Sequence, residues 1–77
     1  PLLPKEFSIL EYLVRNKEKV LSREQIEDQI WNYDYAGSSN NVDGYMSRLR
    51  KKIDEGSSTK LIHTIRGAGW VIREERP

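Results

Sequence analysis

Cysteine is absent from this chain of 77 residues, which excludes disulfide bonds and thiolate metal sites and predicts a reducing compartment. With a single histidine, His63, a catalytic zinc site would lack a second imidazole ligand. No apolar run approaches the roughly 18 residues that a membrane helix needs, and the first residues lack the regions of a signal peptide. We therefore expect a cytoplasmic piece of a longer protein, without a membrane partner, that folds as one small domain over residues 1–77.

Signatures of catalysis are also missing. No pair of carboxylates stands out as an acid–base couple, and the sequence has neither a nucleophile elbow nor a phosphate-binding glycine loop. His63 lies in an alternating stretch that can place it on the surface, the ordinary position of a solitary histidine. The sequence thus predicts no catalytic residue, no cofactor and no metal, and the chain is not expected to be an enzyme.

A large excess of one charge is lacking too, since the net charge is only +1. Residues 1–38 hold five basic and seven acidic side chains, a net charge of −2, whereas residues 39–77 hold eight basic and five acidic ones, a net charge of +3. This uneven distribution is expected if the second half of the chain meets phosphate. Ordinary solvated charge is the alternative explanation.

The first half of the chain predicts two helices. One covers residues 4–15, because Pro4 suits a first helical position and Glu6 favours the positive N-terminus of a helix. Its expected buried stripe is Phe7, Leu10, Leu13 and Val14.

The second helix begins at a capping box, SREQ at residues 22–25, where Leu21 can pack onto Ile26. Ile26, Ile30 and Trp31 are expected to face inward. Residues 32–38 are rich in Asn, Asp, Gly and Ser and predict a loop.

A third helix is predicted over residues 39–53, capped by Ser39 or Asn40 and stopped by Gly56. Its apolar residues, spaced four, three and four apart, form a narrow stripe: Val42, Met46, Leu49 and Ile53. The β-rich runs 61–65 and 70–72 flank the glycine turn RGAG and predict a hairpin.

This order of elements predicts a mainly α domain with a small antiparallel sheet, a winged helix-turn-helix of three helices plus a C-terminal β-hairpin wing. A helix with an outward basic face beside a hairpin tipped by arginine suits DNA. The helix at 39–53 would enter the major groove, and the wing at 61–73 would lie on the backbone or in the minor groove.

The outward face of the third helix supplies the candidate contacts with bases. Arg48 offers a forked donor that matches guanine, Asn40 or Asn41 can bind adenine, and Asp43 can accept from cytosine or hold Arg48. Cations at the end of a helix also complement its dipole, so a solvated helix end is the alternative. The predicted DNA-binding residues are Asn40, Asn41, Asp43, Gly44, Tyr45, Ser47, Arg48, Arg50, Lys51, Thr64 and Arg66.

Gly44 is unusual because a glycine inside a helix costs about 1 kcal/mol relative to alanine. Close approach of the helix backbone to DNA would explain it, and tolerance on an exposed face is the alternative. Tyr45 lies at the edge of the apolar stripe. Its hydroxyl can reach a phosphate, but simple half-burial explains it equally well.

The segments PKEF, VLSREQ, SRLRKKI and TIRGAGW follow one another in this chain. Together with the tryptophan that closes the second helix, they resemble the C-terminal effector domain of OmpR/PhoB-family response regulators over nearly the whole chain. The resemblance implies sequence-specific binding of double-stranded promoter DNA by tandem copies on direct-repeat half-sites, after phosphorylation of a separate receiver domain. It also implies that residues 39–53 form the recognition helix and that Arg66 lies on the wing.

The resemblance further implies that the loop after the second helix contacts RNA polymerase, whereas a plain connector is the alternative. The residues concerned are Asn32, Tyr33, Asp34, Tyr35, Ala36, Gly37 and Ser38.

This chain departs from the family pattern at several positions. Leu3 occupies a cap position where relatives commonly carry Thr or Ser, so a weaker first cap is expected. Asn40 and Ser47 replace frequent basic residues, and Trp70 replaces a common tyrosine. The N-terminal sheet and the receiver domain of the family lie outside this sequence.

Two other functional classes stay open at this point. A winged helix can serve protein interaction, in which case binding to DNA would depend weakly on salt and show no sequence preference. An enzyme accessory domain would need a concave pocket with convergent titratable groups, and the sequence offers few residues to build one.

Overall fold

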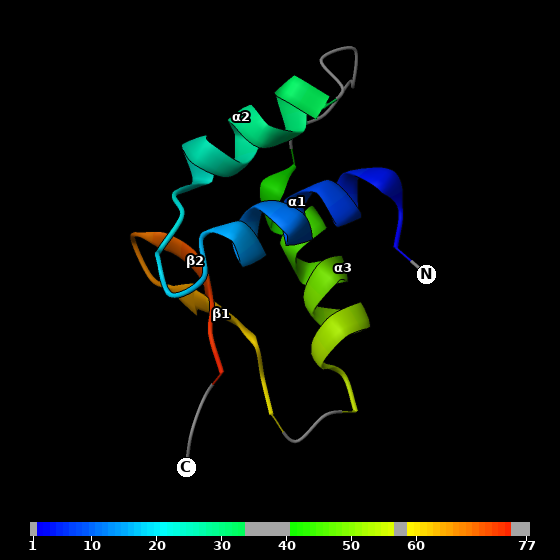
Figure 1. Cartoon of the computed structure of the whole chain (residues 1–77), viewed down its shortest axis with the longest axis vertical. Coiled ribbons are helices and arrows are strands. Elements are labelled where there is room, and N and C mark those ends of the chain that lie inside the picture. Colours follow the sequence, from blue (N-terminus) through cyan, green and yellow to red (C-terminus); the bar gives the residue numbers. More distant parts are fainter. Residues whose placement is uncertain (1, 34–40, 57–58, 75–77) are drawn as a thin grey trace.

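The computed structural model describes residues 2–33, 41–56 and 59–74, with the backbone alone for residues 31–33. Figure 1 shows three helices with a β-hairpin beside them. The elements are α1 (Pro4–Arg15), α2 (Arg23–Tyr33), α3 (Val42–Asp54), β1 (Ile62–Ile65) and β2 (Gly69–Ile72). Both the order of elements and the winged helix-turn-helix arrangement agree with the sequence prediction. None of the helices in the described ranges has both the length and the apolar character to cross a membrane.

The buried face of α1 differs from the predicted stripe. Leu13 is buried, but Phe7 and Val14 are 56% and 53% exposed, and the other core residue is Ile9. The prediction was wrong for Phe7 and Val14 because two polar residues, Glu6 and Ser8, lie on the inner side of the helix. Their partners on other helices, such as Gln29, which donates to the Ser8 hydroxyl at 3.0 Å, make their burial tolerable. The inner face is therefore rotated toward Ile9.

The start of α2 follows the predicted capping box. The Ser22 Oγ accepts from the Gln25 amide at 3.1 Å, and the Gln25 side chain accepts from the Ser22 amide at 2.8 Å. The predicted loop boundary was wrong, because α2 continues through Asn32 to Tyr33. Asn and Tyr disfavour a helix by less than about 1 kcal/mol, which does not stop one that is already propagating.

The start of α3 also differs from the prediction. Asn41, and neither Ser39 nor Asn40, is the N-cap, and its side-chain oxygen accepts from the Gly44 amide at 3.0 Å. At the other end the helix stops at Asp54, just before Gly56, whose φ of 84° favours glycine. The buried Asp54 carboxylate accepts from the amides of Leu61 and Ile62, both at 3.1 Å. These bonds fix the hairpin to the end of α3.

The hairpin pairs antiparallel, with Ile62 opposite Ile72 and Ile65 opposite Gly69. It is also joined to the segment between α1 and α2. Leu21 and Trp70 exchange two backbone hydrogen bonds, of 2.7 and 2.9 Å, as an isolated antiparallel bridge. The wing is therefore held on the side of the helices by the main chain as well as by side chains.

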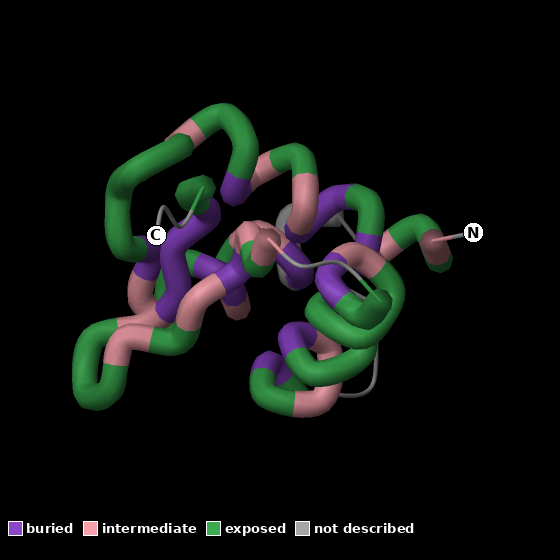
Figure 2. Tube along the Cα trace, turned by 90° about the horizontal axis from the view of Figure 1, so that it is seen from below, coloured by how far each residue is buried: buried purple, intermediate pink, exposed green. Residues whose placement is uncertain are grey.

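A single core lies where the helices and the hairpin meet, and Figure 2 shows the buried parts of the trace turned toward one another there. Leu21 and Ile26, the predicted staple at the start of α2, are both part of it. The buried core residues are Ile9, Leu13, Leu21, Ile26, Ile30, Val42, Met46, Leu49, Ile62, Trp70 and Ile72.

Candidate nucleic-acid interface

The outward face of α3 is polar and open to solvent, as the sequence predicts. Val42, Met46 and Leu49 are buried along one side of the helix. Tyr45 is half-buried at the border of this side, and Gly44, on the opposite side of the helix, is also half-buried. The exposed residues are Asp43, Ser47, Arg48, Arg50, Lys51 and Lys52.

The face of α3 continues onto the wing. The Arg50 guanidinium donates to the Thr64 hydroxyl on β1 at 2.8 Å. A shallow groove of about 240 Å³ runs between the two elements and is lined by Asp43, Met46, Ser47, Arg50, Thr64 and Trp70. The structure therefore brings Asp43, Ser47 and Arg50 of α3 together with Thr64 on one surface.

The tip of the hairpin carries Arg66, which is exposed. The next residue, Gly67, has a φ of 79°, in the left-handed region that favours glycine, and so permits the tight turn. A second groove lies between this tip and the start of α2. Its lining consists of Arg23, Glu24, Asp43, Thr64, Arg66, Gly67, Ala68, Gly69 and Trp70.

Arg23 belongs to this surface but was missed by the sequence analysis. Its guanidinium donates to the Asp43 carboxylate at 2.9 Å and lies over the Trp70 ring, 5.3 Å from its centre. Asp43 therefore holds Arg23, whereas the sequence analysis considered Arg48 as its partner. The sequence did contain a signal for Arg23, because this residue directly follows the capping serine at the start of the second helix. In a helix-turn-helix, that start lies close to the third helix.

Arg48 pairs with a residue of α1. Its Nε lies 3.5 Å from the Glu6 Oε2, and its guanidinium carbon is 4.9 Å from the centre of the Tyr45 ring. The other Glu6 oxygen accepts from the Lys52 ammonium at 2.7 Å and from the Leu3 amide at 3.0 Å. The last bond is the reciprocal half of a capping box, in which the Glu6 side chain accepts from the N-cap amide, whereas Leu3 has no side-chain oxygen to accept from the helix amides.

The Glu6 side chain is fully buried, so its charge state depends on these partners. Burial raises the pKa of the carboxyl group. The hydrogen bonds from Lys52 and Leu3 and the positive charges of Lys52 and Arg48 lower it further than burial raises it. The pKa of Glu6 is consequently below its ordinary value, and the group is an anion at neutral pH.

Gly44 has a structural explanation that the sequence analysis did not consider. A Cβ placed on Gly44 would lie 2.7 Å from the Nδ2 and 3.0 Å from the Cγ of Asn41. This is the side chain that caps α3 by accepting from the Gly44 amide. Glycine at this position therefore leaves room for the cap.

We expect Gly44→Ala to change the free energy of unfolding by less than about 0.5 kcal/mol, because a gain of about 1 kcal/mol in helix propensity offsets a cap loss of about 1 kcal/mol. In an Asn41→Ala background the cap is already gone, and the same exchange should stabilise the domain by about 1 kcal/mol. Urea unfolding of the four proteins measures the difference. Equal effects in the two backgrounds would show that the methyl group and Asn41 do not compete.

The predicted residues outside this surface fall into two groups. Asn40 and the loop residues Asp34, Tyr35, Ala36, Gly37 and Ser38 lie outside the described residues. Asn32 and Tyr33 lie in the last turn of α2.

The single histidine, His63, is half-buried, and its Nε2 lies 3.2 Å from the Arg73 carbonyl oxygen. Across residues 2–33, 41–56 and 59–74, no three His, Asp or Glu side chains gather as a metal site.

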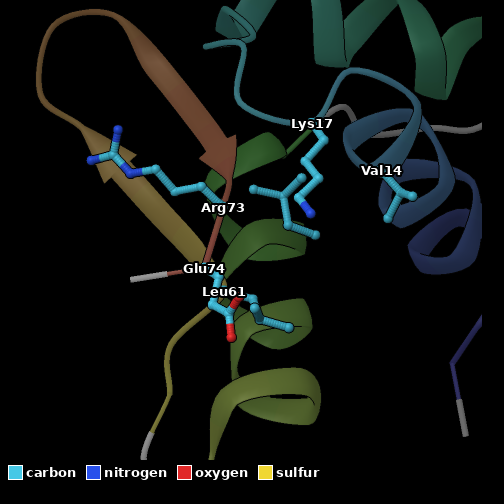
Figure 3. Close-up of a pocket in the computed structure, with 6 residues that line it drawn as sticks. Val14, Lys17, Leu61, Arg73 and Glu74 are labelled. Atoms are coloured by element: carbon cyan, nitrogen blue, oxygen red, sulfur yellow. The ribbon is translucent and has the colours of Figure 1, made fainter. Parts of the chain in front are cut away.

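Another cavity, of about 250 Å³, lies between the end of α1 and the end of the hairpin (Figure 3). Its lining consists of Val14, Lys17, Leu61, Ile72, Arg73 and Glu74. Figure 3 shows the Arg73 side chain extending away from Val14 and Lys17. Arg73 therefore does not converge with Lys17 on this cavity.

Comparison with known proteins identifies this arrangement. Residues 1–72 match the family described as "Transcriptional regulatory protein, C terminal". The chain is 49% identical over 71 residues to the probable transcriptional regulatory protein TcrX of Mycobacterium tuberculosis, a match that covers 92% of this chain and 30% of that protein. It is 40% identical over 72 residues to the response regulator MprA of Mycobacterium leprae, with 94% of this chain and 32% of that protein covered.

Solved structures show the same fold. The DNA-binding domain of Bacillus subtilis CssR has a TM-score of 0.74 and 34% identity, over 95% of this chain and 78% of that one. The C-terminal domain of the nisin resistance regulator NsrR has a TM-score of 0.76 and 31% identity, over 97% and 76%. The resemblance seen in the sequence is confirmed. The chain belongs to the family of C-terminal DNA-binding domains of transcriptional regulatory proteins of the OmpR/PhoB type, which are not enzymes.

Proposed function

We propose that this domain binds double-stranded promoter DNA sequence-specifically as the effector part of a two-component response regulator. In this proposal α3 lies in the major groove, and the hairpin, residues 61–73, lies on the backbone or in the minor groove. The chain spans 30% of the length of TcrX and 32% of the length of MprA. A receiver domain would lie outside this sequence, and control of DNA binding by its phosphorylation is therefore part of the proposal.

One observation carries the proposal. The exposed basic face of α3 and the hairpin tip with Arg66 belong to a single surface, joined by the hydrogen bond from Arg50 to Thr64. A helix with exposed donors fits the major groove, and an arginine beside it can enter a narrow minor groove. The proposed contacts are Asn40, Asn41, Asp43, Gly44, Tyr45, Ser47, Arg48, Arg50, Lys51, Thr64 and Arg66.

Two protein partners complete the proposal. A second copy of the domain would occupy an adjacent direct-repeat half-site, and RNA polymerase would contact the segment that begins at the end of α2, residues 32–38. Support comes from the family resemblance and from relatives named as response regulators. A promoter with one half-site deleted tests the first partner, because loss of the neighbouring copy should weaken binding at the remaining half-site.

We expect Arg48→Ala and Arg66→Ala to weaken DNA binding in different ways. Loss of Arg48 should cost about 1–3 kcal/mol and relax the preference at one base pair, because its fork is proposed to bind guanine. Loss of Arg66 should reduce affinity for all duplexes, with selectivity only for narrow, A·T-rich minor grooves. Selection of sites from a random duplex library, followed by titration of both variants, measures this. A uniform loss for Arg48→Ala would contradict its base-reading role.

A further inference from the structure

Glu6 is a charged residue that the fold buries completely, in the first turn of α1. Its carboxylate lies between two cations of α3, Lys52 and Arg48, which are four residues apart and so lie on the same side of that helix. A buried carboxylate is costly to keep unless it is paired and hydrogen-bonded. Its presence at the junction of α1 and the DNA-facing helix therefore needs an explanation.

The two oxygens of Glu6 are used differently. Oε1 accepts from Lys52 and from the Leu3 amide, so the ammonium of Lys52 already supplies a counter-charge. Oε2 is buried and, in the part of the chain that the structure describes, accepts no hydrogen bond. It lies 3.5 Å from the Arg48 Nε. One oxygen thus serves the packing of α1, while the other is directed at an exposed arginine.

Arg48 is held from two directions. The Oε2 of Glu6 faces its Nε edge, and the Tyr45 ring lies against the guanidinium face at 4.9 Å. The side chain nevertheless remains 51% exposed. With the Nε edge turned toward Glu6, the two Nη nitrogens retain their donors for a ligand. Because two contacts restrict the rotamers of Arg48 before binding, less conformational entropy is lost when it binds.

We propose that Glu6 is a positioning residue for DNA sequence recognition: its carboxylate holds the Arg48 guanidinium against Tyr45, so that the Nη donors meet a base in one orientation. The inference rests on the proposed function, since it requires Arg48 to contact DNA. The negative charge of Glu6 also reduces the attraction of this region to phosphate. Glu6 therefore increases selectivity without increasing general affinity.

The test is Glu6→Gln, compared on the selected operator and on a scrambled duplex. The ratio of the two affinities should fall about tenfold, which corresponds to 1.4 kcal/mol. Affinity for the scrambled duplex should stay equal or rise. Glu11→Gln is the matched control, because Glu11 is an exposed glutamate of the same helix, paired with Arg15 at 3.4 Å. This control removes the same charge and should leave the ratio unchanged.

A second comparison separates positioning from a structural role. In an Arg48→Ala background, Glu6→Gln should no longer change the ratio. A merely structural Glu6 would instead reduce affinity for both duplexes equally, which would overturn the inference. If Glu6→Gln does not fold, Tyr45→Leu should lower the ratio, because it removes the ring that lies against the Arg48 guanidinium.

Failure of the inference and failure of the proposed function give different results. If the unaltered domain shows no preference for any duplex, the proposed function falls and the inference falls with it. If Arg48→Ala loses the preference but Glu6→Gln and Tyr45→Leu keep it, the proposed function stands and the positioning role is refuted.

Discussion

Replacing Gly69 with alanine is expected to lower the free energy of unfolding by about 3–5 kcal/mol. Gly69 has a φ of 145°, a conformation that costs a residue with a side chain about 1–3 kcal/mol. A Cβ there would lie 1.9 Å from the carbonyl oxygen and 2.7 Å from the carbonyl carbon of Leu21. Because these are backbone atoms, the strand must move and break its two hydrogen bonds to Leu21, each worth about 1 kcal/mol.

Gly67 provides the matched control on the same hairpin. Its φ of 79° also disfavours alanine, but a Cβ would meet no atom within 4 Å. Gly67→Ala should therefore cost only about 1–2 kcal/mol. Urea or thermal unfolding of the two variants measures the difference. Similar losses in both would show that the contact between the wing and Leu21 contributes little to stability.

Local signals in the sequence predicted most of the elements. The proline and glutamate at the start of α1, the capping box of α2 and the glycine turn of the hairpin act on residues close by in the chain. The bounds of α1 and the positions of β1 and β2 were accordingly close to those observed. The cap of α3 was misplaced because several adjacent residues, including Asn40 and Asn41, can all accept from a helix amide.

Tertiary contacts decided what the sequence could not. The apolar residues of α1 allow two overlapping stripes, and only the packing of α2 and α3 selects Ile9 over Phe7. The contact of Glu6 with Lys52 joins residues 46 positions apart. No local pattern indicates such a pair.

At the candidate interface, too, local sequence signals predicted some features and tertiary contacts decided the others. Helical periodicity correctly placed Ser47, Arg48 and Lys51 on the exposed side of α3. Helical periodicity could not predict which residues of other helices pair with α3, because Arg23 comes from α2 and Glu6 from α1. These two residues pair with charges on α3, so they also determine how many cations remain for DNA.

Binding to DNA is expected to weaken steeply with salt. If four to six phosphates are neutralised, log K should fall against log[salt] with a slope of about −4 to −5, which is roughly a 250- to 1,000-fold loss between about 50 and 200 mM salt. The surface has enough exposed cations to contact this number of phosphates. These cations are Arg23, Arg48, Arg50, Lys51, Lys52 and Arg66.

The cations should not contribute equally to this slope, because carboxylates already neutralise some of them. Arg23 is paired with Asp43 at 2.9 Å, so Asp43→Asn should make the slope steeper. Lys51→Ala and Arg66→Ala should each make it shallower by about 1. Arg15→Ala, which removes a cation paired with Glu11 on α1, is the control and should leave the slope unchanged. A slope near zero for the unaltered domain, together with equal binding to all duplexes, would instead indicate a winged helix that docks on another protein.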